Sequence, residues 1–249
     1  MARRKIENYM TDHTEIRKEM IATCLRMNAA GLNVGTAGNL SVRIGGGFLV
    51  TPSGVPYETM TPGQIVEMDF NERYYGDTIP SSEWRFHHAI LKHRPDANVV
   101  LHSHAIHCAI LASCRLDIPP VHYRVATAGG SLIKCSGYAP FGTEALSREA
   151  LAALGPRDAC LLANHGVITL GTTMAQAFAL LEEVEYLARH YIGTRLLGCG
   201  VALNEVEMAV VLQRFKTYGK QADKLGDVPD SVGDRVIPPK RGGDRLLQE

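Results

Sequence analysis

Residues 98–113 read NVVLHSHAIHCAILAS, and the fold class follows from this stretch. Its first part is a short β-branched apolar run, which predicts a buried strand. The part that follows, AIHCAILAS, predicts a helix. A strand that runs directly into a helix is typical of an α/β domain, and 249 residues are enough to bury the core of one such domain.

Further helices and strands are predicted on both sides of this stretch. Apolar spacing and capping residues predict helices over residues 11–31, 83–93, 143–154, 173–197 and 204–218, and a helix start at Thr61-Pro62. The three glycines at 45–47 predict a hairpin between a strand that ends near residue 44 and a strand over 48–51. Two more strands, ACLLA at 159–163 and VITL at 167–170, flank the turn Asn164-His165-Gly166.

The charge and composition exclude some classes of partner. Lysine and arginine together number 26, as do aspartate and glutamate, so the net charge is zero and any anion must be bound locally. The start, MARRKIENYM, lacks the apolar segment of a secretory signal, and no apolar run approaches the roughly 20 residues of a membrane span. The six cysteines are scattered and include no C-x-x-C pair. We therefore expect a reduced, cytoplasmic protein.

The domain organisation is expected to be simple, because the chain contains no internal repeat. We expect one catalytic domain over residues 1–219. After this point the sequence is rich in lysine, aspartate, glycine and proline and has few apolar residues. Residues 220–249 are therefore predicted to form a flexible polar tail.

Three histidines form a candidate metal site. His102 and His104 lie two residues apart, and on a strand such residues project from the same face, so their imidazoles would converge. His165 is the best third ligand, because it lies in a tight turn directly after a buried-type strand. Three imidazoles leave a fourth position open, which is typical of a catalytic zinc site. The other seven histidines are interpreted as ordinary structural or exposed residues.

Glu83 is the candidate acid/base that accompanies these histidines. It lies at the start of a predicted helix, where the helix dipole favours a carboxylate. A carboxylate beside a metal can act as a further ligand and, once substrate displaces it, as a general base.

Three short segments are suited to holding a phosphate group. They combine small residues, hydroxyl groups and, in one case, a helix N-terminus, and they are residues 35–39, 51–54 and 81–82. Arg43 would add positive charge if its strand faces the site. None of these segments matches a P-loop or a dinucleotide-binding fingerprint. They indicate a small phosphorylated ligand.

Together, these residues resemble the class II aldolase/adducin family. The matching segments are GLNVGTAGNLSVR, LVTPSGVPYE, PSSEWRFH, RPDANVVLHSHAIHC, IPPVHYRVATAGG, YAPFGT, NHGVI and FKTYG, which run from about residue 14 to 220. The likeness is greatest to members that cleave L-fuculose 1-phosphate. It implies a single αβα domain with a mixed, largely antiparallel sheet, assembled into a homotetramer with active sites at the subunit interfaces.

The resemblance also implies roles for individual residues. Zinc would be bound by His102, His104 and His165, with Glu83 as a further metal contact and the acid/base. Tyr123 would reach the neighbouring subunit's site and act as an acid toward the aldehyde. The substrate and its phosphate would contact Thr36, Asn39, Ser53, Gly54, Ser81, Ser82 and Tyr218.

The expected function is therefore a zinc-dependent aldolase that reversibly cleaves a ketose 1-phosphate to dihydroxyacetone phosphate and a small aldehyde such as L-lactaldehyde. Within the same superfamily, an L-ribulose-5-phosphate 4-epimerase and a 5-deoxypentulose-phosphate aldolase stay open, with a methylthioribulose-phosphate dehydratase as a more distant alternative. A Schiff-base aldolase would need a lysine, with Lys92 and Lys134 as candidates. A non-catalytic, adducin-like binding module is the alternative from another class.

Overall fold

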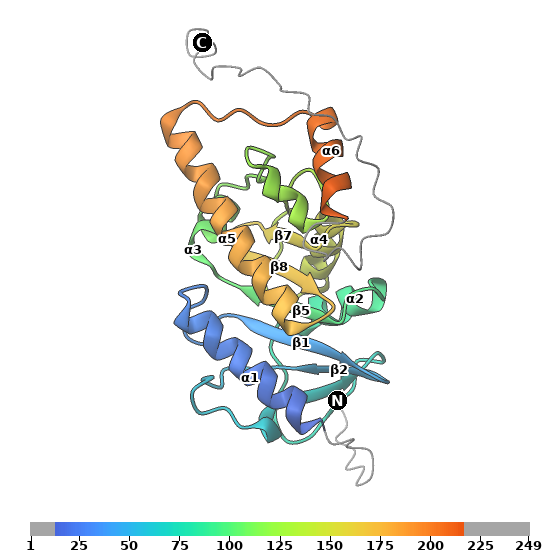
Figure 1. The fold of residues 1–249 in the computed structure, drawn as a ribbon. Coiled ribbons are helices and arrows are strands. Elements are labelled where there is room, and N and C mark those ends of the chain that lie inside the picture. The colour runs from blue at the N-terminus through green and yellow to red at the C-terminus, as the bar shows by residue number, and fades with distance from the viewer. Residues whose placement is uncertain (1–12, 217–249) are drawn as a thin grey trace.

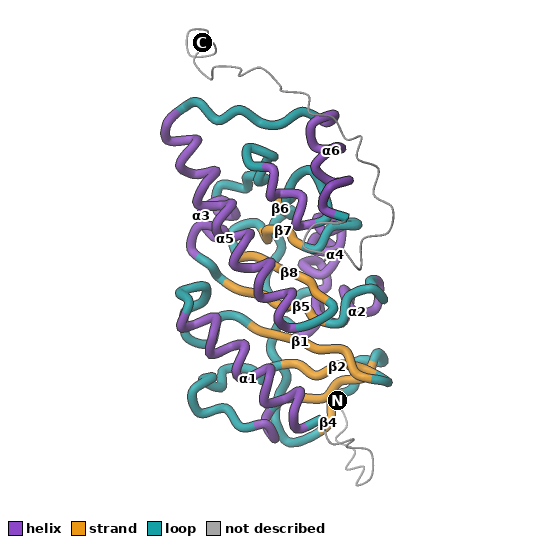
Figure 2. The backbone as a smooth tube through the Cα atoms, in the orientation of Figure 1, coloured by secondary structure: helices purple, strands orange, loops and turns teal. Residues whose placement is uncertain are grey.

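An eight-stranded mixed sheet crosses the molecule in the order β4-β3-β2-β1-β5-β8-β7-β6 (Figures 1 and 2). The structure is a computed structural model that describes residues 13–216. Neighbouring strands run antiparallel except β6 and β7, which are parallel. The strands are β1 (Asn39–Ile44), β2 (Gly47–Val50), β3 (Val66–Asp69), β4 (Tyr74–Tyr75), β5 (Val99–Ser103), β6 (Lys134–Cys135), β7 (Ala159–Leu162) and β8 (Gly166–Gly171).

Helices cover both faces of this sheet. The α-helices are α1 (Thr14–Ala29), α2 (Trp84–His93), α3 (Ile106–Ser113), α4 (Glu144–Leu154), α5 (Met174–Leu197) and α6 (Glu205–Phe215), and the 3₁₀ helices are η1 (Pro62–Gln64) and η2 (Tyr123–Ala128). In Figure 1, α1, α3 and α5 lie in front of the sheet, whereas α2 and α4 lie behind it. The predicted αβα sandwich with a largely antiparallel sheet is therefore confirmed.

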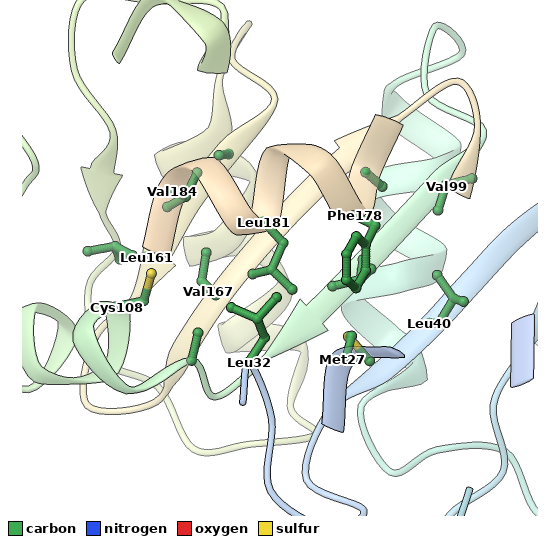
Figure 3. Close-up of a cluster of buried hydrophobic side chains, with 14 of the residues drawn as sticks. Met27, Leu32, Leu40, Val99, Cys108, Leu161, Val167, Phe178, Leu181 and Val184 are labelled. Carbon is green, nitrogen blue, oxygen red and sulfur yellow. The ribbon is translucent and has the colours of Figure 1, made fainter. Parts of the chain in front are cut away.

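Each face of the sheet has its own hydrophobic core. Alternate residues of a strand point to opposite faces, so Leu101 of β5 packs toward α1 and α5, whereas Val100 packs toward α2 and α4. Figure 3 shows the first core, in which Phe178 and Leu181 of α5 pack over the strands. The face of each strand residue thus determines which helices it meets.

The predicted elements correspond closely to the observed ones. The central stretch forms β5 and α3, the glycine turn joins β1 to β2, and Thr173 caps α5 by accepting a hydrogen bond from the Gln176 N–H. The helix start expected at Thr61-Pro62 is confirmed, with Thr61 as N-cap, and the helix is a single 3₁₀ turn, Pro62–Gln64, before β3 begins.

Some predictions fall outside the described part of the chain. Tyr218, the tail over residues 220–249 and the first 12 residues belong to this group. Among the helices that the structure describes, none combines the length and apolar character that crossing a bilayer requires. All six cysteines are free thiols.

Candidate metal centre and active site

His102 occupies the centre of the site and is completely buried on the α2 face of β5. Its Nδ1–H donates to the carbonyl of Val167, 3.0 Å away on the paired strand β8. This bond leaves the lone pair of Nε2 directed away from β8, toward the other site residues. Burial, reinforced by the neighbouring histidines, holds the pKa of His102 well below its usual range, so the ring is neutral at physiological pH.

His104 lies one residue beyond the end of β5, not on the strand as expected. The two imidazoles nevertheless converge, because His104 Nε2 lies 3.1 Å from His102 Nε2. Burial also lowers the pKa of His104.

A tight turn between β7 and β8 brings His165 to the same point. Asn164 adopts a positive φ of 55°, which asparagine tolerates better than most residues, and Arg115 donates to its side chain from the end of α3. Gly166 must stay without a side chain, since a Cβ there would lie 2.4 Å from the carbonyl oxygen of Ser103 and within 3.2 Å of both histidine rings. The ring of His165 ends 4.7 Å from that of His102 and 4.9 Å from that of His104, between centroids.

Glu83 completes the group from the start of α2. Its Oε2 lies 3.3 Å from His102 Nε2, and its Oε1 lies 3.2 Å from His165 Nε2. The side chain makes no capping hydrogen bond to α2. Burial raises the pKa of Glu83, against opposing contributions from His165 and from a hydrogen bond donated by Asn39. The expected stabilisation of this carboxylate by the helix dipole is therefore outweighed by loss of water.

The donor set fits a divalent cation. The three histidines offer nitrogen atoms that all lie within 4.8 Å of one another. His102 Nε2 faces the Glu83 carboxylate with a lone pair, and Glu83 Oε1 is buried without a hydrogen-bond donor. Such acceptors repel unless a cation or a proton lies between them. Two nitrogen ligands of a tetrahedral zinc ion are about 3.3 Å apart, close to the 3.1 Å between His104 Nε2 and His102 Nε2.

The three predicted phosphate segments are also brought together. The Thr51 N–H donates to the Leu40 carbonyl of β1, and the Ser81 N–H donates to the Thr51 carbonyl, both at 3.0 Å. Ser53, Gly54, Thr36 and Ser82 are exposed in these segments, whereas Ser81 is buried and its Oγ accepts from the Glu83 N–H. Residues 51–54 and 81–82 therefore lie side by side at the end of β1 that follows residues 35–39, and we call these three segments the edge beside Glu83. Their role in phosphate binding stays a prediction.

Asn39 is engaged differently from the other predicted phosphate residues. Its Nδ2 donates to Glu83 Oε2 at 2.9 Å, and its Oδ1 accepts from His87 Nε2 at 2.6 Å. Asn39 is directly opposite His102 in the β1–β5 register, which explains why its side chain reaches the carboxylate. A phosphate would therefore have to bind the second N–H of the Asn39 side-chain amide.

The condition set for Arg43 is not met, because its side chain does not face the site. Its guanidinium donates to the carbonyls of Leu91, Arg94 and Ala97 at the end of α2. The Leu91 carbonyl lies in the last turn of α2, where carbonyls lack a partner within the helix, and together with the Arg94 and Ala97 carbonyls just beyond the helix it holds the guanidinium there.

Tyr123 begins η2 and is 46% exposed. Its ring stacks on His122 and lies near Phe215 of α6, and neither of these residues belongs to the histidine cluster. A role of Tyr123 in a neighbouring subunit's site stays a prediction.

Sequence reasoning missed two residues of this region. His87 was interpreted as an ordinary histidine and Ser41 was not singled out, yet both are fully buried and hydrogen-bonded to each other at 2.7 Å. The signal was present in the spacing, because His87 is four residues after Glu83 on α2 and Ser41 is two residues after Asn39 on β1. These spacings place each pair on one face.

Comparison with known proteins agrees with this geometry. The sequence model described as "Class II Aldolase and Adducin N-terminal domain" matches residues 18–192. The L-fuculose phosphate aldolase of Escherichia coli K12 is 45% identical over 214 residues, which cover 86% of this chain and 100% of that protein. A 5-methylthioribulose-1-phosphate/5-deoxyribulose-1-phosphate aldolase of Rhodospirillum rubrum is 47% identical over 207 residues, covering 83% and 94% of the two chains.

A solved structure of an L-fuculose 1-phosphate aldolase superposes with a TM-score of 0.80 at 33% identity, covering 84% of this chain and 99% of that one. The match to the family model takes in all the strands and the histidine cluster. The chain therefore belongs to the class II aldolase and adducin N-terminal domain family.

Proposed function

We propose that this member of the family is a zinc-dependent aldehyde-lyase that reversibly cleaves a ketose 1-phosphate of the L-fuculose 1-phosphate type. Its products would be dihydroxyacetone phosphate and a small aldehyde such as L-lactaldehyde. The observation that carries this proposal is the convergence of His102, His104 and His165 with the buried carboxylate of Glu83. The relatives named L-fuculose phosphate aldolase support the choice of substrate.

The metal would be held by the three imidazoles, with Glu83 as a further contact. A divalent cation in this position acts as a Lewis acid and stabilises the negative charge that develops on the substrate carbonyl oxygen. Imidazole ligands suit several divalent ions, and zinc is proposed because three histidines with an open position are typical of its catalytic sites.

Glu83 would act as the acid/base at the carbon next to the carbonyl. In the synthetic direction it removes a proton from C3 of dihydroxyacetone phosphate, and in cleavage it returns that proton. A general base works best when its pKa lies near the working pH, and burial moves the pKa of Glu83 in that direction. Tyr123, from a neighbouring subunit, would give a proton to the aldehyde oxygen in synthesis and take it back in cleavage.

Binding of the phosphate would orient the substrate. The exposed residues of the edge beside Glu83, together with Asn39 and Ser81, offer hydroxyl groups and backbone N–H groups, and Tyr218 would close over the substrate. Holding the substrate by its phosphate, which is remote from the reacting carbons, makes the reaction effectively intramolecular.

We further propose a homotetramer in the cytoplasm. Large apolar side chains are exposed near the C-terminal end of α5 and on α6, among them Leu196, Leu197 and Val206. Burying them against a second copy would remove apolar surface from water. Such an assembly would also bring Tyr123 to the site it is proposed to serve.

The second candidate is a 5-deoxypentulose-phosphate aldolase, favoured by the similarity to the enzyme of Rhodospirillum rubrum. A Schiff-base mechanism is disfavoured, since Lys92 and Lys134 are both exposed and neither is part of the histidine cluster. An adducin-like binding module is disfavoured by the complete set of metal-binding side chains.

A product assay tests the proposal. The zinc-loaded protein is incubated separately with L-fuculose 1-phosphate, 5-deoxyribulose 1-phosphate, 5-methylthioribulose 1-phosphate and L-ribulose 5-phosphate. The proposal expects release of dihydroxyacetone phosphate with the highest kcat/KM for L-fuculose 1-phosphate. A higher value for 5-deoxyribulose 1-phosphate favours the second candidate, and epimerised product from L-ribulose 5-phosphate contradicts both.

A further inference from the structure

A buried chain of hydrogen bonds ends at the carboxylate of Glu83. Ser41 Oγ lies 2.7 Å from His87 Nδ1, His87 Nε2 lies 2.6 Å from Asn39 Oδ1, and Asn39 Nδ2 lies 2.9 Å from Glu83 Oε2. Ser41 and His87 have no exposed surface, and Asn39 and Glu83 are 4% and 5% exposed. Side-chain bonds of this kind, shielded from water, are stronger than exposed ones.

With Glu83 ionised and His87 neutral, only one arrangement of protons satisfies the whole chain. The ionised carboxylate of Glu83 accepts hydrogen bonds and cannot donate them, so Asn39 must turn its NH₂ group toward it. The amide oxygen of Asn39 then faces His87 and needs a donor, which requires the proton of the imidazole to be on Nε2. Nδ1 is left as an acceptor, and the hydroxyl of Ser41 donates to it.

The protein scaffold fixes these four side chains independently of the metal. Asn39 and Ser41 are on the same face of β1, two residues apart, and pair with His102 and Val100 of β5. Glu83 and His87 are one helical turn apart at the start of α2. Phe86 stacks on the ring of His87 with centroids 4.5 Å apart and also packs edge-on against His102. The ring of His87 therefore has little freedom to rotate.

We infer that His87 and Ser41 are positioning residues, which hold the amide of Asn39 so that its NH₂ group anchors one oxygen of Glu83. The anchored oxygen is Oε2, and Oε1 has no hydrogen-bond donor of its own. Oε1 is then the oxygen left to exchange a proton with the substrate. This inference rests on the proposed role of Glu83 as the acid/base.

The consequence is a specific kinetic signature. Without the donor at His87 Nε2, the amide of Asn39 is free to turn its oxygen toward Glu83, and the carboxylate loses its anchor. Misplacing a catalytic group by about 1 Å can cost on the order of 10²-fold in rate, so kcat should fall. KM should change less than kcat, because neither His87 nor Ser41 is proposed to touch the phosphate, and the only proposed phosphate contact in the chain of hydrogen bonds is Asn39.

The kinetic test compares four variants as zinc-loaded holoenzymes, with kcat expressed per zinc-bound site. His87→Leu removes both hydrogen bonds and should lower kcat roughly 10- to 100-fold. His87→Gln keeps an N–H donor near the position of Nε2 and should recover kcat to within about threefold of wild type. Ser41→Ala should lower kcat about three- to tenfold, the usual effect of one hydrogen bond.

Thr169→Val is the matched control. Thr169 also carries a fully buried hydroxyl on the same sheet, but it faces α5, where it donates to the Ala177 carbonyl at 2.9 Å. Its kcat should equal that of wild type. If His87→Leu does not fold, the contrast between Ser41→Ala and Thr169→Val decides the question.

A second measurement does not depend on activity. The ¹⁵N NMR spectrum of histidine-labelled protein at neutral pH distinguishes protonated from bare ring nitrogens, and the signals lost in His87→Gln identify His87. The inference expects Nε2 protonated and Nδ1 bare. A proton on Nδ1, or on both nitrogens, overturns the chain of bonds.

These outcomes separate the inference from the proposed function. If wild type cleaves its substrate but Ser41→Ala and a folded His87→Leu retain wild-type kcat, the positioning role is wrong and the function stands. If wild type cleaves none of the four sugar phosphates while His87 carries its proton on Nε2, the proposed function fails and the anchoring of Glu83 stands.

Discussion

The two faces of the sheet bury polar groups in different ways. On the α1 and α5 face, the hydroxyls of Ser103 and Thr169 each donate to a nearby backbone carbonyl within a largely apolar core. On the α2 face, polar side chains of β1 and α2 bond to one another and end at Glu83. The first face stabilises the fold, whereas the second uses buried polar groups, each with a partner, to place a reactive carboxylate.

The largest effect is expected on the α2 face, from Glu83→Gln. This change keeps the size of the side chain and its contact with Asn39, but it removes the group proposed to exchange the proton. A positioned general acid or base contributes about 10²–10⁴-fold in rate, so kcat should fall by this factor. The measurement is steady-state release of dihydroxyacetone phosphate, with circular dichroism to verify folding. Near-normal turnover in a folded variant would exclude Glu83 as the acid/base.

On the opposite face, Leu181→Ala should affect stability and leave catalysis unchanged. Leu181 of α5 is fully buried in the core of Figure 3. A buried leucine-to-alanine change costs about 2–5 kcal/mol in the free energy of unfolding, through lost burial and the cavity that remains. Urea denaturation measures this loss, and kcat per folded molecule should equal that of wild type. A fall in kcat comparable to that of Glu83→Gln would mean that the two faces are not functionally separate.

A more gradual effect is expected in the acid dependence of stability. Burial lowers the pKa of His87 to about 3, whereas an unfolded histidine has a pKa of about 6.5. Between these values the unfolded state binds more protons, so the contribution of His87 to stability is complete above pH 6.5 and is lost as the pH falls toward 3. The slope is at most about 1.4 kcal/mol per pH unit.

This dependence is measured by urea denaturation at several pH values, with a chelator present so that metal release does not contribute. The difference in the free energy of unfolding between wild type and His87→Gln should shrink as the pH falls from 6.5 toward 3, since the variant lacks the ionisable ring. If the free energies of unfolding of wild type and His87→Gln change in parallel with pH over this range, His87 is not held neutral by burial.

Much of the fold could be predicted from local sequence. The strand and helix of residues 98–113, the turn before β8 and the cap of α5 follow from short-range patterns, which need no knowledge of distant residues. The histidine pair and the Asn-His-Gly turn could be identified in the same way. The convergence of the histidine pair with His165 could not be predicted from local patterns, since it depends on the pairing of β5 with β8.

The parts that could not be predicted depend on long-range register. The hydrogen bond of Asn39 to Glu83 was not predicted, because it depends on the alignment of β1 with β5, which brings Asn39 opposite His102; its predicted contact with phosphate stays a prediction. Arg43 had an equally plausible partner in an anion, and only the packing of α2 shows that helix-end carbonyls take it instead. His87 was judged by its residue type alone, which does not distinguish a core histidine from one in a chain of bonds.

The central claim, that three histidines hold a catalytic zinc ion beside Glu83, is tested most directly by zinc titration against a competing chelator. Metal-free wild type should bind one zinc ion per chain, and activity should return in proportion to the zinc bound. His102→Ala should lose both tight binding and activity, because it removes the central ligand. Full activity of chelator-treated wild type, or undiminished zinc affinity in His102→Ala, would contradict the account.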